Sequence, residues 1–303
     1  MQLKTVSEVL QGASLSLRKS GIAMPRFEAE LLLSYVTGYS RIELFEKQTE
    51  RIKPATLLIF DKALKKRCAH KPLAYITGEK YFYGYRFLVN DDVLIPRPET
   101  ELIVDRVAEL IKPENRVIDP PYTILDLGTG TGNIAITLAL VMPGTTEVWA
   151  VDISKPALSV AQKNAQMHAV RDKIIWRKGN YFQAIEKDAL GSYFNLIVAN
   201  PPYVSEDEFP LLPITVREYE PKKALFGGKD GLDGYRSIIR EIKNYVRVPA
   251  ILMMEAGCKQ KEQIEQLCRS SNLFHDIKWH HDLAGHNRLM EGLIQALPCR
   301  CDG

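Results

Sequence analysis

The sequence has few cysteines, and their spacing suits neither disulfide bonds nor zinc. Five are present among 303 residues, an odd number, and no two form a Cys-x-x-Cys pair. A disulfide framework and a structural zinc site are therefore not indicated, and a reducing compartment is expected. Cys299 and Cys301 lie near the end of the chain, and we expect both to be free thiols. His280, His281 and His286 have no carboxylates at helical spacing, so no metal site is expected.

Long apolar runs are also missing. No stretch approaches the roughly 18 consecutive apolar residues that a membrane-spanning helix needs. Residues 1–14 lack an apolar segment long enough for a signal peptide, and the acidic Glu8 argues against a mitochondrial presequence. We therefore expect a cytoplasmic protein without a membrane partner.

Neither sign of charge dominates the chain. Lys and Arg number 40 against 37 Asp and Glu, a formal net charge of +3 that does not by itself indicate a polyanionic partner. Residues 1–80, however, carry 14 basic and 8 acidic side chains, a net +6, whereas the remainder carries 26 and 29, a net −3. The basic N-terminal part could face an acidic or nucleic-acid-containing partner, or could be an ordinary solvated surface of lysine-rich helices.

The composition that remains is that of a globular protein. Hydrophobic residues make up 46% and charged residues 25%, and the length suggests a large domain with a smaller companion. In residues 1–72 apolar side chains recur at helical spacing, which predicts a small helical domain. Residues 73–96 alternate with period two around turn residues, which predicts a β-hairpin linker. Residues 97–303 would form the third and largest segment.

Strands and helices alternate along this third segment. Short apolar stretches typical of buried strands occur at 123–127, 147–151, 173–177, 195–200 and 250–255. Amphipathic stretches between them predict helices. The alternation predicts an α/β fold with a mostly parallel, doubly wound sheet, and ligands should bind at the carboxyl ends of its strands.

A glycine-rich loop follows the first of these strands, from Asp126 to Gly132 in the sequence DLGTGTG. Glycines let the backbone approach a ligand closely, and the helix N-terminus that follows favours a carboxylate. Asp152 ends the second strand, where it could accept both hydroxyls of a ribose or cap the next helix. Loop and acid together predict a nucleoside-bearing cofactor. The spacing Gly-x-Gly-x-Gly departs from the dinucleotide pattern and favours S-adenosylmethionine.

The segment after the third strand could bind an adenine. Asn180 could pair with the edge of the base, and Tyr181 or Phe182 could cover its face. A turn asparagine next to core aromatic residues is an equally good interpretation of the same segment.

The sequence Asn200-Pro201-Pro202-Tyr203 follows the fourth strand. Consecutive prolines fix the backbone and lack N–H donors, so their carbonyls remain as acceptors. The side-chain oxygen of Asn200 and the carbonyl of Pro201 could hold the two hydrogens of a planar NH2 group, and Tyr203 could stack on its plane. This segment predicts a site for an amide or an exocyclic base amine.

The motifs that begin at Asp126, Val151 and Asn200 resemble those of class I S-adenosylmethionine-dependent methyltransferases that modify planar nitrogens. Three longer segments, at 73–101, 220–239 and 282–290, resemble the HemK/PrmC family of peptide chain release factor N5-glutamine methyltransferases. The resemblance extends over essentially the whole chain.

This resemblance implies a seven-stranded methyltransferase domain joined to a small helical domain through a β-hairpin. It implies transfer of a methyl group from S-adenosylmethionine, leaving S-adenosylhomocysteine, to the glutamine of the Gly-Gly-Gln loop in class 1 release factors, in support of translation termination. The cofactor would be bound by Gly128, Thr129, Gly130, Thr131, Gly132, Asp152, Asn180, Tyr181 and Asn200. The catalytic residues would be Asn200, Pro201 and Tyr203, and the glutamine would be bound by these together with Pro202, Arg97 and Glu99.

Asn180 departs from the family pattern, which usually has aspartate there. A neutral acceptor typically contributes about 1–2 kcal/mol less than a charged one, so weaker cofactor binding is expected. Two other functions compete with the family's activity. A nucleic-acid amino methyltransferase would act on the same kind of planar NH2 group, and a non-catalytic protein could use the fold to hold a translation factor. Segments 97–101 and 220–239 favour the protein-modifying family, so we expect a monomer that binds class 1 release factors and has no direct nucleic-acid substrate.

Overall fold

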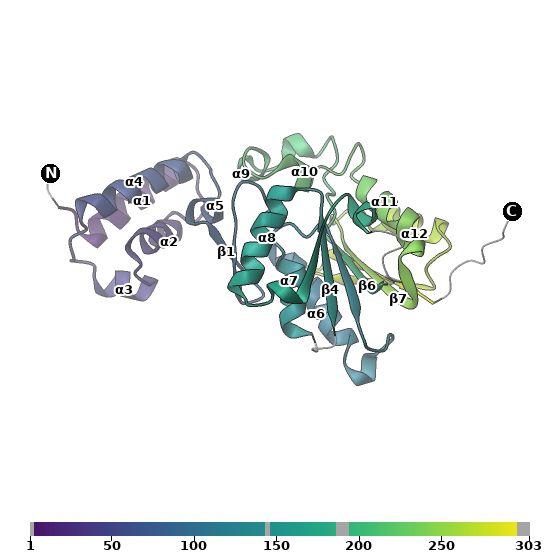
Figure 1. The fold of residues 1–303 in the computed structure, drawn as a ribbon. Coiled ribbons are helices and arrows are strands. Elements are labelled where there is room, and N and C mark those ends of the chain that lie inside the picture. The colour runs from purple at the N-terminus through teal and green to yellow at the C-terminus, as the bar shows by residue number, and fades with distance from the viewer. Residues whose placement is uncertain (1–2, 143–145, 186–193, 296–303) are drawn as a thin grey trace. The chain divides into compact units, whose positions relative to one another are not determined.

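The computed structural model describes residues 3–142, 146–185 and 194–295 (Figure 1). The chain divides into two compact units. Unit 1 comprises Met1–Glu79 together with Pro213–Tyr219, and unit 2 comprises Lys80–Leu212 and Glu220–Gly303.

Unit 1 is helical. Its helices are α1 (Val6–Lys19), α2 (Pro25–Thr37), α3 (Arg41–Glu46), α4 (Pro54–Cys68), α5 (Leu73–Thr77) and, from the second segment, α9 (Ile214–Arg217). Capping boxes begin two of them, because Thr5 and Ser40 each exchange hydrogen bonds with the glutamate three residues later. The apolar faces of α1, α2 and α4 meet in one core. The predicted helical character of the N-terminal residues is therefore confirmed.

Unit 2 contains a seven-stranded sheet in the order β5-β4-β3-β6-β7-β9-β8. The strands are β3 (Thr123–Leu127), β4 (Glu147–Asp152), β5 (Ile174–Lys178), β6 (Phe194–Ala199), β7 (Val246–Glu255), β8 (Asp276–His281) and β9 (Asn287–Ile294). The first five pair in parallel, and β9 runs antiparallel to both β7 and β8. The α/β class and the seven-stranded sheet are confirmed.

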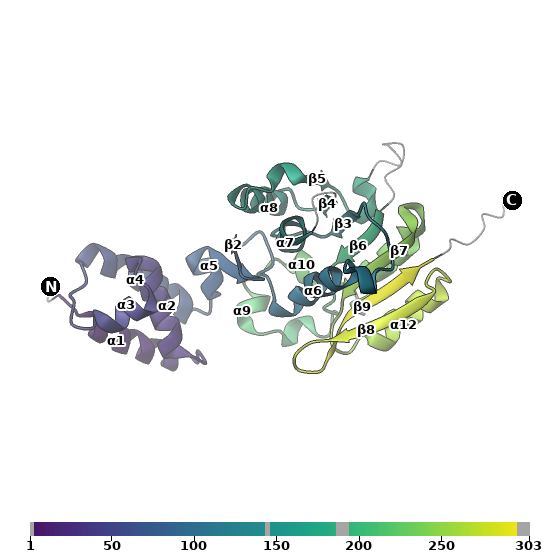
Figure 2. The same ribbon diagram turned by 90° about the horizontal axis from the view of Figure 1, so that it is seen from below.

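Helices cover both faces of this sheet. In Figure 1, helices α6 (Glu101–Leu110), α7 (Asn133–Val141) and α8 (Lys155–Met167) lie to the left of the strands, and α11 (Asp233–Glu241) and α12 (Lys261–Ser270) lie to the right. Two separate apolar cores result, one on each face. Figure 2 shows the hairpin β8–β9 beside α12. The short helix α10 (Lys222–Leu225) lies in the segment between β6 and α11.

The segment predicted as a β-hairpin begins differently. Residues Leu73–Thr77 form α5, and strands β1 (Glu79–Phe82) and β2 (Tyr85–Leu88) then form a two-stranded sheet. The aliphatic and aromatic residues of α5 suit a strand as well as a helix turn, and Gly78, with its left-handed backbone, ends the helix. The division of the chain at residues 72 and 96 stays a prediction.

Three observations concern sites and membranes. No helix among the described residues is long and apolar enough to cross a membrane. In the same part of the chain, no group of three or more His, Cys, Asp and Glu side chains could hold a metal ion. Cys68, Cys258 and Cys268 are free thiols, whereas Cys299 and Cys301 lie outside the described residues.

Candidate functional site

A cavity of about 780 Å³ lies within unit 2, at the carboxyl ends of β3, β4, β5 and β6. The chain continues from β3 to β4 on one side and returns to β6 on the other, so the cavity lies where the strand order reverses. Open α/β sheets bind their ligands at this place. The predicted site residues that line the cavity are Arg97, Gly128, Thr129, Gly130, Thr131, Asp152, Asn180, Tyr181, Asn200 and Pro202.

The glycine loop lines one wall of the cavity. A Cβ atom on Gly128 would meet no atom within 4 Å, so the loop leaves open space where a ligand can approach its backbone. Gly132 has a different role and does not line the cavity. Its φ is +78°, and a Cβ there would lie 2.8 Å from Ile136 Cδ1 and 3.1 Å from Ala161 Cβ. Gly132 therefore permits close packing of α7 and α8.

Asp126 holds this loop from beneath. Its Oδ2 accepts hydrogen bonds from the hydroxyl of Thr129 at 2.7 Å and from the backbone N–H of Ala135 at 3.2 Å. Complete burial raises the pKa of Asp126 to about 7. Its Oδ1 has no hydrogen-bond partner within the described part of the chain. The sequence placed Asp126 at the start of the motif without a role for its side chain.

Asp152 connects the glycine loop to the end of β4. Its two oxygens accept from the backbone N–H groups of Gly130, at 2.8 Å, and Ser154, at 2.7 Å. Burial raises the pKa of this carboxyl, and the two hydrogen bonds act in the opposite direction. The cap of α8 is Ser154, whose hydroxyl accepts from Ala157. Each carboxylate oxygen retains further acceptor capacity, so Asp152 can still receive the hydroxyls of a ribose.

Asn180 and Tyr181 lie across the cavity floor from the glycine loop, at the end of β5. Asn180 is exposed and lines the cavity. Tyr181 has a left-handed backbone with φ of +47°, and burial raises the pKa of its hydroxyl to about 12. A ring in this position can cover one face of a flat ligand.

Asn200 lines the cavity just beyond β6, and its amide nitrogen is fully engaged. Nδ2 donates to Glu255 Oε2 at 2.9 Å and to Thr100 Oγ1 at 3.2 Å. The hydroxyl of Thr100 in turn donates to the same Glu255 oxygen at 2.6 Å. Thr100 and Glu255 are each only 2% exposed. This arrangement leaves Oδ1 of Asn200 as an acceptor for a group in the cavity.

The rest of the Asn200–Tyr203 segment is held from behind. Pro202 lines the cavity, whereas Pro201 is buried and Tyr203 packs against the core next to α11 and α12. Burial raises the pKa of the Tyr203 hydroxyl to about 12. The stacking role predicted for Tyr203 and the acceptor role of the Pro201 carbonyl stay predictions.

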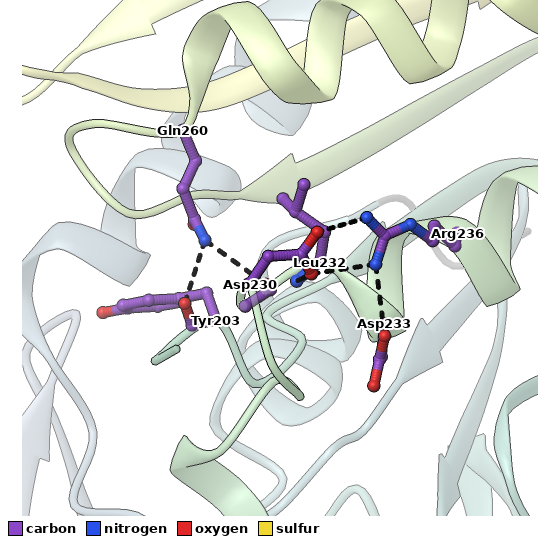
Figure 3. Close-up of polar contacts among 7 residues, drawn as sticks. Tyr203, Asp230, Leu232, Asp233, Arg236 and Gln260 are labelled. Atoms are coloured by element: carbon purple, nitrogen blue, oxygen red, sulfur yellow. Dashed lines mark hydrogen bonds and ion pairs between the residues drawn. The ribbon is translucent and has the colours of Figure 1, made fainter. Parts of the chain in front are cut away.

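Gln260 connects this segment to two others (Figure 3). Its Nε2 donates to the carbonyls of Tyr203, at 2.9 Å, and Gly231, at 3.3 Å, and its Oε1 accepts from the N–H of Gly257 at 3.0 Å. A Cβ atom on Gly231 would lie 2.4 Å from the Tyr203 carbonyl oxygen. Only glycine allows the two backbones to lie this close.

The turn that contains Gly231 is closed by an ion pair, also visible in Figure 3. The guanidinium of Arg236 pairs with both Asp230 and Asp233, and Asp230 Oδ1 accepts from the N–H of Leu232 at 3.2 Å. The Arg236 contact lowers the pKa of Asp230 to about 2. These exposed contacts shape the turn at the start of α11 rather than the cavity.

Arg97 lines the cavity from the segment that precedes α6. Its Nη2 donates to Glu220 Oε1 at 2.6 Å, and Glu220 Oε2 accepts from the N–H of Ile95 at 3.2 Å. Glu220 is only 5% exposed, so this carboxylate fixes the 95–97 segment against the wall. Glu99 is half-buried and does not line the cavity.

Four residues in and around the site had no role in the sequence analysis: Thr100, Glu220, Glu255 and Gln260. Thr100 and Glu220 fall inside the segments that carried the family resemblance. Glu255 is the polar end of the apolar stretch 250–254 in β7, which lies beside β6, the strand that precedes Asn200. This position suggests a site residue once the strand order is known.

The residues present fit S-adenosylmethionine. A glycine loop with open space, an acid at the next strand end and the aromatic residue Tyr181 together line one cavity. The volume lies within the range of small-molecule sites, which is about 300–1,000 Å³. Asn200 lines the same cavity and offers an acceptor there.

Comparison with known proteins assigns the chain to two family models. Residues 8–78 match the PrmC N-terminal domain, and residues 118–293 match a methyltransferase domain.

Individual relatives agree with these models. A release factor glutamine methyltransferase from Chlorobaculum tepidum is 37% identical over 289 residues, which cover 95% of this chain and 96% of that protein. A bifunctional methyltransferase from Rickettsia typhi is also 37% identical, over 95% of this chain, but the chain spans only 57% of its length. A solved methyltransferase structure from Pyrococcus furiosus superposes with a TM-score of 0.52 at 14% identity, covering 78% of this chain and all of that chain, and thus shares the fold.

Proposed function

Because the chain belongs to the family of release factor glutamine methyltransferases, we propose that it methylates the side-chain amide nitrogen, N5, of the glutamine in the Gly-Gly-Gln loop of class 1 peptide chain release factors. The protein is thus a protein-(glutamine-N5) methyltransferase that supports translation termination. The observation that supports this substrate most is that Asn200 lines the same cavity as the glycine loop and Asp152.

The cofactor is S-adenosylmethionine, which supplies an electrophilic methyl group and leaves as S-adenosylhomocysteine. The glycine loop and Asp152, which line the cavity, would hold it, with Tyr181 and Asn180 on its adenine side.

The chain's own residues must make a poor nucleophile react, because the lone pair of an amide nitrogen is delocalised. Asn200 Oδ1 and the Pro201 carbonyl accept the two N–H hydrogens of the substrate glutamine and turn its nitrogen toward the methyl group. With the cofactor bound, its methyl group would pass from sulfur to this nitrogen, which would then release one proton to water. Orientation of this kind can lower the barrier by roughly 7–11 kcal/mol, and acceptors aimed at the nitrogen stabilise the positive charge that develops on it.

The N-terminal domain, residues 1–72, is proposed to dock the release factor, with 73–96 as a linker to the methyltransferase domain at 97–303. Its net positive charge supports this role. Two apolar side chains on the short helix α3, Ile42 and Phe45, are also exposed by 73% and 74%. Exposed apolar side chains next to each other on a helix are typical of contact surfaces.

We further propose that the protein acts as a cytoplasmic monomer and does not modify nucleic acids directly. Light scattering of the purified protein measures its mass in solution, and a mass of twice 34.3 kDa would contradict the monomer.

The choice of substrate can be tested by incubating the protein with methyl-labelled cofactor and, separately, a class 1 release factor, DNA and RNA. Label should enter the release factor alone. Label in DNA or RNA would indicate the nucleic-acid activity instead, and cofactor binding without transfer to any of the three would indicate a non-catalytic protein.

A further inference from the structure

Asn200 is useful to the reaction only if its oxygen, and not its nitrogen, faces the cavity. An amide can rotate by 180° about its last bond with almost no change in shape, so the hydrogen-bond partners decide which atom faces which way. The two partners of the Asn200 amide within the described residues are Glu255 and Thr100.

Only one of the two orientations of the amide can form hydrogen bonds with these partners. The Thr100 hydroxyl gives its single hydrogen to Glu255 Oε2, so towards Asn200 it can only accept. An ionised Glu255 can also only accept. A rotated amide would place Oδ1 of Asn200 against Glu255 Oε2 and Thr100 Oγ1, with no proton in either gap.

From this geometry we propose that Glu255 is a positioning residue. Together with Thr100, it keeps the Asn200 oxygen directed at the substrate nitrogen, and it makes this oxygen a stronger acceptor. The inference rests on the function proposed above. Glu255 itself touches no substrate, since it is 2% exposed and lies behind Asn200.

The strengthening follows from the charge on Glu255. An amide whose N–H groups donate to a carboxylate carries more negative charge on its oxygen, because hydrogen bonds in a chain polarise one another. The oxygen of Asn200 then stabilises the positive charge that develops on the substrate nitrogen. Its negative charge is increased because the amide nitrogen of Asn200 donates to the buried carboxylate of Glu255.

Glu255 can also lose this role when it gains a proton. Burial raises its pKa to about 7, and the hydrogen bonds from Thr100 and Asn200 and the charge of Arg288 act in the opposite direction. A protonated Glu255 can donate to Asn200 Oδ1, which allows the amide to rotate and present its NH2 group to the cavity. Turnover should therefore rise with pH through about 7.

The test uses the whole chain and the variant Glu255→Gln, which keeps the size and one acceptor oxygen but replaces the other oxygen by an NH2 group and cannot ionise. With release factor as substrate, turnover should fall about 10- to 30-fold at pH 8, the usual difference between charged and neutral hydrogen bonds. The Kd for S-adenosylmethionine and the KM for release factor should change less than about threefold, which a merely disrupted fold would not allow. Glu262→Gln, an exposed change on α12, is the matched control and should behave as the unaltered protein.

The pH profile separates a positioning role from a structural one. The rise in turnover near pH 7 should be present in the unaltered protein and absent in Glu255→Gln. The titratable and charged groups around Glu255 are Arg288, Glu99, Tyr203 and Tyr235, and all four are unchanged in the variant. Asp126, which also has a raised pKa, is unchanged as well, so the difference between the two profiles belongs to Glu255.

Thr100 gives a second pair of variants in case Glu255→Gln does not fold. Thr100→Val removes the hydroxyl at nearly constant volume and should lower turnover about 5- to 10-fold, whereas Thr100→Ser keeps the hydroxyl and should restore most of it. Equal turnover in the Val and Ser variants would overturn the proposal.

A measurement without substrate keeps this proposal distinct from the proposed function. In protein labelled with 15N at asparagine, the side-chain signal of Asn200 is identified by its loss in Asn200→Ala. Its chemical shift should titrate near pH 7 in the unaltered protein and stay constant in Glu255→Gln. A shift that does not titrate in either protein overturns the inference about Glu255. A titrating shift in a protein that methylates no release factor would support Glu255 as the partner of Asn200 and contradict only the proposed substrate.

Discussion

The two walls of the cavity are built in different ways. On the cofactor wall, Gly128 and Asp152 each lie at the end of a strand or in the loop that directly follows it. On the substrate wall, Asn200 also follows a strand, but its amide is held by Thr100 and Glu255, which are 100 and 55 residues away in the sequence. In the proposed site, strand ends thus supply the groups that touch ligands, while distant segments determine how the substrate group is oriented. Changes in the two walls should therefore affect different steps.

The largest effect is expected for Asn200→Ala. The variant loses the acceptor that orients the substrate nitrogen, and turnover should fall about 100- to 1,000-fold, as when one stabilising group is removed from a catalytic site. Binding of S-adenosylmethionine, measured by calorimetry, should stay within about threefold, because the cofactor wall is intact. Asn244→Ala, an exposed asparagine far along the sequence, serves as the control. If the Asn200 variant had normal turnover, Asn200 would not orient the substrate, and the two walls would not have separate roles.

Asp152→Asn should give the opposite pattern. Replacing a charged acceptor by a neutral one weakens a hydrogen bond by about 1–2 kcal/mol, so the Kd for S-adenosylmethionine should rise about 10- to 30-fold. Turnover at saturating cofactor should stay within about threefold of the unaltered protein. An unchanged Kd, or a loss of turnover that cofactor cannot restore, would contradict the role given to Asp152.

Gln260→Leu tests the support behind the substrate wall. The change leaves the carbonyls of Tyr203 and Gly231 without their shared donor and should lower the free energy of unfolding by about 2–3 kcal/mol, measured by urea denaturation. Turnover should fall about 3- to 10-fold with unchanged cofactor affinity. Gln263→Leu, an exposed change on the same helix, should alter neither quantity. Equal effects of the two changes would show that Gln260 does not support the segment.

The smallest effect is expected for Asn180→Asp. The side chain is exposed, so water screens the added charge, and the affinity for S-adenosylmethionine should increase only about three- to fivefold. Asn180→Ala should reduce it by a similar factor. Calorimetry measures both, and a weaker rather than stronger affinity for the aspartate variant would place Asn180 outside the adenine site.

Local sequence predicted the strand ends and the glycine loop that line the cavity, for a physical reason. Buried strands are short apolar stretches, and loops that approach a ligand need glycine, so TILDL followed by GTGTG could be identified without knowing the fold. The bounds of β3 were predicted as Thr123–Leu127, as observed. Gly132 was the exception, because its packing against Ala161 depends on where α8 lies.

The substrate wall could be predicted only in part. The prolines after Asn200 indicated that this segment is a candidate site, but the sequence does not indicate which side chains contact it. The side chains that lie there, Thr100, Glu255 and Gln260, come from distant parts of the chain, and the order of the strands in the sheet brings them together. Likewise, the strands β8 and β9 were not located in the sequence, and only the family resemblance implied a sheet of seven strands. Long-range contacts of this kind depend on tertiary structure and have no local signal.

In the proposed reaction, Asn200 directs the amide nitrogen of the substrate glutamine toward the methyl group of S-adenosylmethionine. Tandem mass spectrometry of a class 1 release factor, after incubation with the purified protein and S-adenosylmethionine, tests it most directly. We predict one added methyl group on the side-chain amide of the Gly-Gly-Gln glutamine and none when Asn200→Ala is used. A methyl group on any other residue, or the same modification made by the Asn200 variant, would contradict the account.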